Sequence, residues 1–221
     1  MKRNVRIETA AYVAHELRTT LALQRALLEL ALDSDTDAVG WREVGNDVLR
    51  ACRQQEQLLD SCLSLAQSRR GLRRRTPIDL AAVAAETLSA HDLSELDCAV
   101  TLDDAWTSGD LDLVQRLVVN LVSNAVRHNV DGGRLELETR AESGRALLHV
   151  ANTGPLIPER ELPRLFEPFE RFGANPRTLS DGSGLGLAIV REIADAHGAR
   201  LTARPGTAGG LAVDVAFIAL D

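Results

Sequence analysis

Residues 120–129 read Asn-Leu-Val-Ser-Asn-Ala-Val-Arg-His-Asn and place polar side chains inside an apolar helical pattern. The polar members recur at spacings that bring them near one helix face: Asn120, Asn124, Arg127 and His128. Asparagine is a poor helix former in a helix interior, so two of them indicate a specific task. Amide oxygens can ligate magnesium, and cationic groups can meet phosphate oxygens. The alternative interpretation is the polar edge of a surface helix.

A second stretch, residues 181–187, reads Asp-Gly-Ser-Gly-Leu-Gly-Leu and opens a helix that we predict to run from Leu185 to His197, ending at Gly198. Glycines let a backbone approach a phosphate closely, and a helix N-terminus offers free N–H groups. The stretch lacks the lysine of a Walker loop and the βαβ context of a dinucleotide fold. A flexible turn is therefore the competing interpretation.

Three further stretches carry weaker signals. Residues 150–155 end in Asn-Thr-Gly-Pro, and residues 165–172 place apolar anchors beside an arginine; alone, each is more typical of a turn or core. Residues 15–21 read His-Glu-Leu-Arg-Thr-Thr-Leu. His15 falls beside an apolar seam, with Thr19 one turn along. A neutral imidazole is a competent nucleophile, and the Glu16 carboxylate can orient it and take its proton. The alternative is an ordinary solvated helical histidine.

The first 70 residues carry a repeat that alternates spacings of three and four, which is typical of a coiled-coil seam. A polar break at residues 33–37 divides the repeat into two helices, which predicts an antiparallel hairpin. One hairpin cannot bury both apolar stripes well, so we expect a homodimeric four-helix bundle. The seam positions are Ile7, Ala10, Ala14, Leu17, Leu21, Gln24, Leu28 and Ala31, then Val44, Val48, Ala51, Gln55, Leu58, Cys62 and Leu65.

Residues 71–77 are expected to form a linker, because Gly71 and Pro77 bound it. The basic run at 69–75 is consistent with a solvated helix end or, alternatively, with a nucleic-acid or membrane contact. Residues 78–221 mix both periodicities: Asp79 and Asp110 are candidate helix caps, and strands are predicted at 134–141, 145–151, 200–203 and 212–218. This grouping predicts a two-layer α+β sandwich.

Composition excludes several classes of function. The 221 residues carry a net charge of −7 and contain 2 Trp, 1 Tyr and 4 Phe, which argues against nucleic-acid binding. The 3 cysteines lie far apart and indicate reduced thiols in a cytoplasmic protein. We expect no membrane segment and no signal peptide in this chain. It is thus either a soluble protein or the cytosolic portion of a longer, membrane-anchored sensor.

Taken together and in this order, the stretches resemble the catalytic core of two-component sensor histidine kinases. Residues 15–21 are similar to the phospho-acceptor box of a dimerisation and histidine-phosphotransfer domain, here residues 1–70. Four later stretches resemble the boxes of an ATP-binding domain with the Bergerat fold, here residues 78–221: 120–129, 152–155, 166–171 and 182–187.

The resemblance implies a role for each matching residue. His15 would attack the γ-phosphate of ATP, Glu16 would act as base, and Thr19 would position a water when the phosphorylated partner is dephosphorylated. Asn124 would hold Mg²⁺, Asn152 would meet the adenine amino group, and a mobile lid would lie between residues 172 and 182. The implied nucleotide-binding residues are Asn120, Asn124, Arg127, His128, Asn152, Gly154, Arg171, Gly182, Gly184, Leu185 and Gly186.

The implied function is ATP-dependent autophosphorylation of a histidine, followed by phosphotransfer to an aspartate on the receiver domain of a response regulator. This sequence departs from the family pattern at three positions. Thr20 replaces a proline, so no helix kink is expected there. Asn152 replaces an aspartate and is a weaker, neutral acceptor. Leu156 replaces a glycine and stiffens its loop.

Two other interpretations follow from the same residues. The substitutions at Asn152 and Leu156 also fit a dimeric scaffold or phosphatase with a weakened nucleotide site. An ATP-hydrolysing clamp is disfavoured, because Asn120 stands where such relatives carry the glutamate that activates water. That interpretation also leaves His15 and Glu16 without a role.

Overall fold

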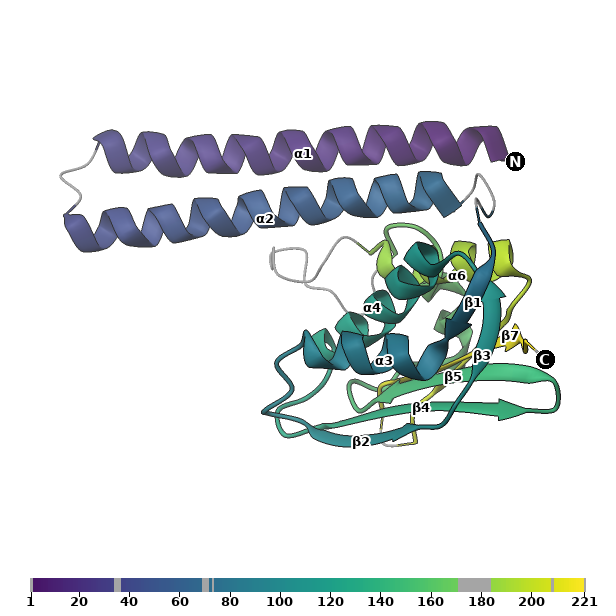
Figure 1. The fold of residues 1–221 in the computed structure, drawn as a ribbon. Coiled ribbons are helices and arrows are strands. Elements are labelled where there is room, and N and C mark those ends of the chain that lie inside the picture. The colour runs from purple at the N-terminus through teal and green to yellow at the C-terminus, as the bar shows by residue number, and fades with distance from the viewer. Residues whose placement is uncertain are drawn as a thin grey trace. The chain divides into compact units, whose positions relative to one another are not determined.

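The computed structural model describes residues 2–33, 37–68, 72, 74–170, 184–207 and 209–220. The chain divides into two compact units, Met1–Cys62 and Leu63–Asp221. The first unit is helical, and the second places helices on one face of a sheet (Figure 1). The α+β fold predicted from sequence is confirmed. No helix in the described ranges is long and apolar enough to cross a membrane.

The first unit is formed by α1 (Lys2–Asp33) and most of α2 (Ala38–Ser68), which lie side by side as an antiparallel hairpin (Figure 1). The carboxylate of Asp37 accepts a hydrogen bond from the Gly40 N–H at 2.8 Å, which satisfies a free donor in the first turn of α2. The predicted break at residues 33–37 therefore coincides with the end of α1 and the start of α2, although 34–36 lie outside the described residues.

Part of the predicted seam packs inside this hairpin. Four of its members are buried between the two helices: Gln24, Ala31, Ala51 and Leu58. The alternate seam positions on α1 point elsewhere, since Leu21 is 57% exposed and Leu28 is 38% exposed. The hairpin therefore leaves an apolar stripe of α1 uncovered, as expected if one hairpin cannot bury both stripes.

The buried layer contains a polar contact. The Gln24 side-chain amide donates to Gln55 Oε1 and lies 3.4 Å from Cys52 Sγ, while the Gln55 amide donates to the Leu17 carbonyl. Buried polar groups at seam positions favour the one register in which they are hydrogen-bonded. These contacts therefore fix how α1 and α2 align.

The second unit is built on a five-stranded sheet with strand order β2-β4-β5-β7-β6, in which only the β2–β4 pair is parallel. A separate antiparallel ribbon pairs β1 with β3. In chain order the elements are β1 (Thr76–Asp79), α3 (Leu80–Ser89), β2 (Asp97–Leu102), β3 (Trp106–Gly109), α4 (Leu111–Arg127), β4 (Arg134–Glu142), β5 (Arg145–Asn152), η1 (Glu159–Glu161), α5 (Leu162–Leu165), α6 (Gly186–His197), β6 (Arg200–Pro205) and β7 (Leu211–Ile218).

The predicted helix boundaries are confirmed by their capping contacts. The Asp79 side chain accepts from the Ala81 N–H, and the Asp110 side chain accepts from the Leu113 N–H. Gly198 ends α6 at φ 65°, in the left-handed region that favours glycine. The predicted β4–β5 hairpin is confirmed too, whereas β1, β2 and β3 were not predicted from the sequence.

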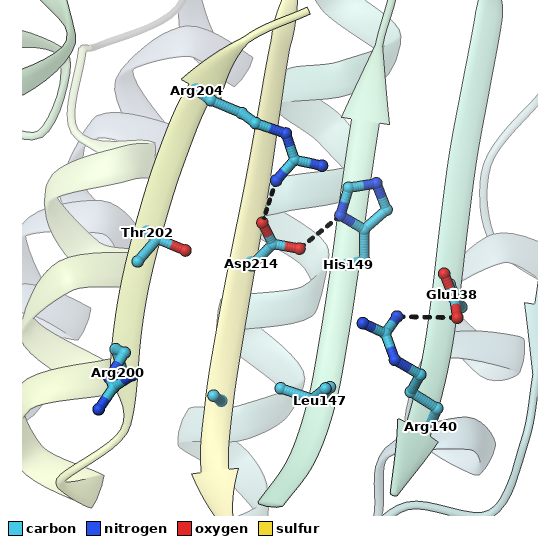
Figure 2. Close-up of a pocket in the computed structure, with 9 residues that line it drawn as sticks. Glu138, Arg140, Leu147, His149, Arg200, Thr202, Arg204 and Asp214 are labelled. Carbon is cyan, nitrogen blue, oxygen red and sulfur yellow. Dashed lines mark hydrogen bonds and ion pairs between the residues drawn. The ribbon is translucent and has the colours of Figure 1, made fainter. Parts of the chain in front are cut away.

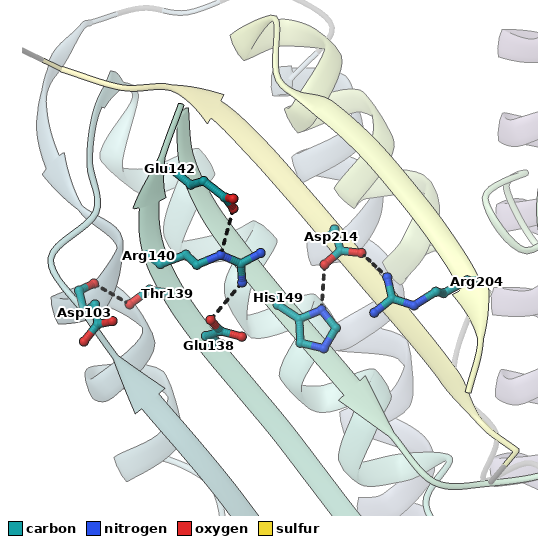
Figure 3. Close-up of polar contacts among 8 residues, drawn as sticks. All are labelled: Asp103, Glu138, Thr139, Arg140, Glu142, His149, Arg204 and Asp214. Atoms are coloured by element: carbon teal, nitrogen blue, oxygen red, sulfur yellow. Dashed lines mark hydrogen bonds and ion pairs between the residues drawn. The ribbon is translucent and has the colours of Figure 1, made fainter. Parts of the chain in front are cut away.

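Helices α3, α4 and α6 cover one face of the sheet (Figure 1). Alternate strand residues point into that interface and are buried: Leu135, Leu137, Ala146, Leu148, Val150, Val213, Val215 and Phe217. Burying one side chain of this size stabilises the fold by about 1.5–3 kcal/mol, so this layer dominates the stability of the unit. The opposite face of the sheet carries charged side chains (Figure 3).

A buried histidine joins the two longest helices of this layer. His197 ends α6, and its Nδ1–H donates to the Ile193 carbonyl at 2.8 Å. Its Nε2 accepts the backbone N–H of Asp110, the N-cap of α4, at 3.1 Å, so the ring is neutral. Burial lowers the pKa of His197 below its usual value near 6.5.

We predict that this contact makes stability depend on pH. Because the native pKa of His197 is depressed, its contribution is present above pH 6.5 and is lost as pH falls through the lower native value. Urea unfolding at pH 7.5 and 5.5 should therefore show a smaller loss of stability on acidification in His197→Gln than in the wild type. An equal loss in both proteins would contradict the assignment.

Candidate nucleotide-binding site

The first turn of α6 packs against the middle of α4 at Asn120. The Asn120 side-chain amide donates to the Arg116 carbonyl at 2.7 Å. A Cβ added to Gly186 would lie 3.2 Å from Asn120 Oδ1, tighter than ordinary contact. Leu185 precedes α6 and provides no side-chain cap, so the N-cap residue does not engage the first N–H groups of this 12-residue helix. Such a helix start favours an anion.

Further candidates lie toward the C-terminal end of α4. Asn124 is half-buried, and its side-chain amide makes no hydrogen bond to any described residue. Arg127 and His128 are exposed where the helix ends. The C-terminal end of α4 therefore carries three candidate ligand groups, the amide of Asn124 and the basic side chains of Arg127 and His128.

Asn152 ends β5 beside the C-terminus of α4. Its side chain is buried, and its Nδ2 donates to the carbonyls of His128 and Thr153. These contacts turn the amide nitrogen toward the backbone and leave Oδ1 without a donor among the described residues. The oxygen is therefore an oriented acceptor, as an adenine amino group would require.

The loop after Asn152 packs too closely for side chains. A Cβ on Gly154 would lie 2.6 Å from the His128 carbonyl oxygen and 3.3 Å from the Gly210 Cα. Gly209 and Gly210 both adopt positive φ, at 80° and 79°, and the Gly210 N–H donates to the Pro155 carbonyl. Sequence reasoning missed Gly209 and Gly210, although a glycine pair directly before a predicted strand signals a backbone approach.

Leu156 does not need the backbone freedom of a glycine. Its side chain is 80% exposed, and its φ lies outside the positive region. The loop therefore holds its conformation without the glycine that the family pattern places there.

Gly184 contacts the segment that follows α5. The Phe169 N–H donates to the Gly184 carbonyl at 2.9 Å, and a Cβ on Gly184 would lie 2.9 Å from the Phe169 Cα. Phe169 adopts φ 68°, which is rare for a bulky side chain. Residues 171–183, which include the candidates Arg171 and Gly182 and the predicted lid, lie outside the described residues.

Arg191 on α6 holds this segment in place and was also missed. Its guanidinium pairs with Glu167 at 2.9 Å and donates to the Pro163 carbonyl at 3.3 Å. Its Cζ lies 5.8 Å from the centre of the Phe166 ring. An arginine five residues after Gly186 gave no sequence signal, because its partners are distant in the chain.

The candidate phospho-acceptor lies in the other unit. His15 and Glu16 belong to α1, but their side chains are outside the described part. Thr19 is exposed one turn along. The 32-residue α1 continues through Thr20 without interruption, in accord with the absence of a proline there.

The residues present fit a nucleotide bound with magnesium. Gly154, Gly184 and Gly186 make close approaches that a Cβ would obstruct. The Asn124 amide makes no hydrogen bond to any described residue, so it is available to a cation. Within the described ranges no group of three or more His, Cys, Asp or Glu could hold a metal. Magnesium would therefore rely on Asn124 and on phosphate oxygens, the donor set that this ion prefers.

Comparison with known proteins identifies the family. The profile of the "Histidine kinase-, DNA gyrase B-, and HSP90-like ATPase" family matches residues 109–219, and that of the "His Kinase A (phospho-acceptor) domain" matches residues 5–71. The chain belongs to the sensor histidine kinases of two-component systems and carries their catalytic core.

Individual relatives agree with this assignment. The sensor protein CutS of Streptomyces coelicolor is 41% identical over 208 residues, covering 91% of this chain and 50% of CutS. The chain thus spans about half the length of the curated relatives it matches. The mycobacterial sensor histidine kinase MprB is 28% identical with a TM-score of 0.58, covering 66% of this chain and 97% of the MprB chain. Histidine kinase ThkA, solved in complex with response regulator TrrA, shares the fold with a TM-score of 0.74 at 20% identity, covering 95% of this chain and 60% of that one.

We predict that Asn152→Asp destabilises the protein. A carboxylate there would face the His128 and Thr153 carbonyls in place of a donor, which raises its pKa and costs about 1–3 kcal/mol at pH 7. The deficit should shrink as pH falls through this raised native pKa and should be largely gone near pH 4, close to the usual pKa of aspartate of about 3.9. Thermal unfolding at pH 7 and 4 measures it, with exposed Asn46→Asp as the control. A variant as stable as the wild type at pH 7 would overturn the described Asn152 contacts.

Proposed function

We propose that this chain phosphorylates His15 with the γ-phosphate of ATP and passes the phosphoryl group to an aspartate of a response regulator. The observation that carries the proposal is the glycine-lined approach of α6 to Asn120 of α4, with an oriented acceptor at Asn152. The same chain supplies His15 and Glu16 on a helical hairpin. The chain thus contains both a candidate nucleotide-binding site and a candidate phospho-acceptor histidine.

On the nucleotide side, Asn152 Oδ1 would accept from the adenine amino group, while Gly154 allows the loop to pass closely beneath it. Arg127, His128 and Arg171 would neutralise phosphate oxygens. The start of α6, with Gly182, Gly184, Leu185 and Gly186, would offer backbone N–H groups to the phosphates. Asn124 would ligate magnesium, supported by Asn120.

The proposed step is a direct phosphoryl transfer. A ring nitrogen of His15 forms a bond to the γ-phosphorus as the bond to the bridging oxygen breaks, and ADP leaves. Glu16 takes the proton from the other ring nitrogen, so charge balances. Magnesium, when bound, neutralises charge on the phosphate oxygens. Such transfers depend on positioning and charge stabilisation, which backbone donors and cations supply.

Transfer to His15 is favoured over hydrolysis. Asn120 occupies the helix position where ATP-hydrolysing relatives carry a water-activating glutamate. Its amide donates to the Arg116 carbonyl, and an amide cannot serve as a general base. Water therefore lacks an activating group at this position.

The proposed partner is a receiver domain. The structurally similar ThkA is in complex with the response regulator TrrA, which supports a partner of this class for the present hairpin. Thr19 is exposed one turn from His15, where it could position water during dephosphorylation of that partner. We assign phosphotransfer to residues 1–70 and ATP binding to 78–221, with 71–77 as the linker, and place both in the cytoplasm, where ATP is available.

A second candidate function rests on Asn152. A neutral acceptor binds the adenine amino group less strongly than the usual carboxylate. A dimeric scaffold or phosphatase with a weakened nucleotide site would then act through Thr19 without taking up phosphate.

Labelling with γ-labelled Mg-ATP separates these functions. We predict acid-labile label on the wild type and none on His15→Gln, because the P–N bond of a phosphohistidine hydrolyses in acid and the variant lacks the proposed acceptor. Gln115→Ala, on the same helix as Asn124, should label normally, whereas Asn124→Ala should not. Absence of label on the wild type would favour the scaffold, and acid-stable label would refute phosphohistidine chemistry.

We also propose that the hairpin dimerises through the uncovered stripe of α1. Substituting Leu21→Asp and Leu28→Asp together should give a monomer by light scattering, because two carboxylates would be buried without partners. Leu30→Asp is the control, since Leu30 lies about 200° around the helix from Leu28. A wild-type monomer at high concentration, or a dimer that survives the double substitution, would contradict the bundle.

A further inference from the structure

The sheet face that turns away from the helices contains a hollow of about 520 Å³. It lies over β4, β5, β7 and β6, and Figure 2 shows its lining side chains. The candidate nucleotide residues lie on the other side, around α4 and the start of α6. The hollow is therefore a separate feature of the ATP-binding unit.

Strand register explains why the hollow exists. Arg140, Leu147, Ala216 and Arg200 occupy one row across the four strands, each paired with the next. The two inner members are short and apolar, and the outer two are long and cationic. Since neighbouring strands lie about 4.8 Å apart, the outer two backbones are separated by roughly 14 Å. The long side chains of Arg140 and Arg200 stand on either side of the shorter Leu147 and Ala216, which leaves an open space between the two arginines.

The adjacent row holds His149 and Asp214, which form a fixed polar cluster with Arg204 from the row beyond (Figure 3). His149 Nδ1 donates to one oxygen of Asp214 at 2.6 Å, and Arg204 pairs with the other oxygen at 2.6 Å. The hydrogen bond from His149, assisted by the charge of Arg204, holds the pKa of Asp214 below its usual range. Asp214 thus stays ionised with both oxygens engaged.

The remaining charges leave one cation uncompensated. Arg140 pairs with Glu138 at 2.8 Å and with Glu142, which lies outside the lining, at 3.1 Å. Arg200 has no hydrogen bond or ion pair with any described residue, and neither does the hydroxyl of Thr202 beside it. Among the three arginines that line the hollow, Arg200 is therefore the one that no described carboxylate offsets, in a chain whose net charge is −7.

We propose that this hollow binds a small organic monoanion, a carboxylate on an apolar body. Arg200 and Arg140 face the carboxylate from the two sides, and Leu147 with Ala216 contacts the apolar body. One uncompensated cation matches one negative charge, whereas the second charge of a phosphate dianion would have no unpaired cation to offset it. Thr202 and the second ring nitrogen of His149 are placed to orient a polar substituent.

The site has the general properties of ligand pockets. Its volume falls within the range of about 300–1,000 Å³ typical of such pockets, and its polar groups converge on an apolar floor. Guanidinium groups bind carboxylates in planar, two-pronged geometry. β5 carries Leu147 and His149 and ends at Asn152, so a ligand here would contact the strand that also reaches the candidate adenine site.

Benzoate is a suitable probe, with neutral benzamide as its matched control. Amide NMR spectra of the ¹⁵N-labelled full chain should show saturable shifts at Leu147, His149 and Ala216 with benzoate and none with benzamide. Arg200→Gln should weaken benzoate binding about tenfold, because a charged hydrogen bond is lost. Arg160→Gln, at an exposed arginine on η1, should leave the affinity unchanged.

A second variant tests the apolar base of the hollow, formed by Leu147 and Ala216. Ala216→Phe should fill the hollow and abolish the benzoate shifts while circular dichroism remains that of the folded protein. The proposal is overturned if benzoate produces no shifts at these residues. It is equally overturned if benzamide binds as well, or if Arg200→Gln and Ala216→Phe both retain wild-type affinity.

Discussion

The close packing of α6 on α4 sets the geometry of the ATP-binding unit. At one end, the missing Cβ of Gly186 lets the first turn of α6 approach Asn120. At the other end, buried His197 accepts the N–H of Asp110 at the start of α4. The two helices therefore run antiparallel, and α6 is fixed at both of its ends, which leaves little freedom in where its first N–H groups point.

The candidate nucleotide site therefore depends more on the course of the backbone than on charged side chains. Gly154 brings the loop after β5 against the end of α4, and Gly209 and Gly210 pack against that loop, where side chains would clash. An anion at a helix N-terminus gains about 0.3–1 kcal/mol, so several such donors and cations must act together. Asn152 fits this scheme because its amide nitrogen stabilises the loop and its oxygen accepts from no described residue. The substitution of asparagine for the family's aspartate has thus been accommodated structurally, at the expense of acceptor strength.

Local chemistry made much of this fold predictable. Helix ends were predictable because capping depends only on residues next to each other in the chain. Asp79 and Asp110 accept hydrogen bonds from the first turn of their helices, and Gly198 adopts the left-handed conformation that ends α6. The β4–β5 hairpin was predictable because apolar and polar residues alternate along both strands. By contrast, β2 is an edge strand whose burial does not alternate, so no period of two marks it.

The features that sequence reasoning missed depend on contacts between distant segments. Arg191 meets Glu167 only after α5 folds against α6, and the positive φ of Phe169 accompanies its pairing with Gly184. The hollow on the outer sheet face likewise requires the register of four strands, which no single strand encodes. Motif order, in contrast, located the candidate nucleotide residues, because each box is contiguous in the chain.

The most direct test of the central claim is an NMR titration of the full chain with a non-hydrolysable ATP analogue and magnesium. The account predicts that the largest amide shifts fall at Asn124, Asn152, Gly154 and Gly186, with little change at Leu147 and Ala216 on the opposite face of the sheet. Saturable binding whose shifts avoid α4 and the start of α6 would contradict it, as would the absence of any binding.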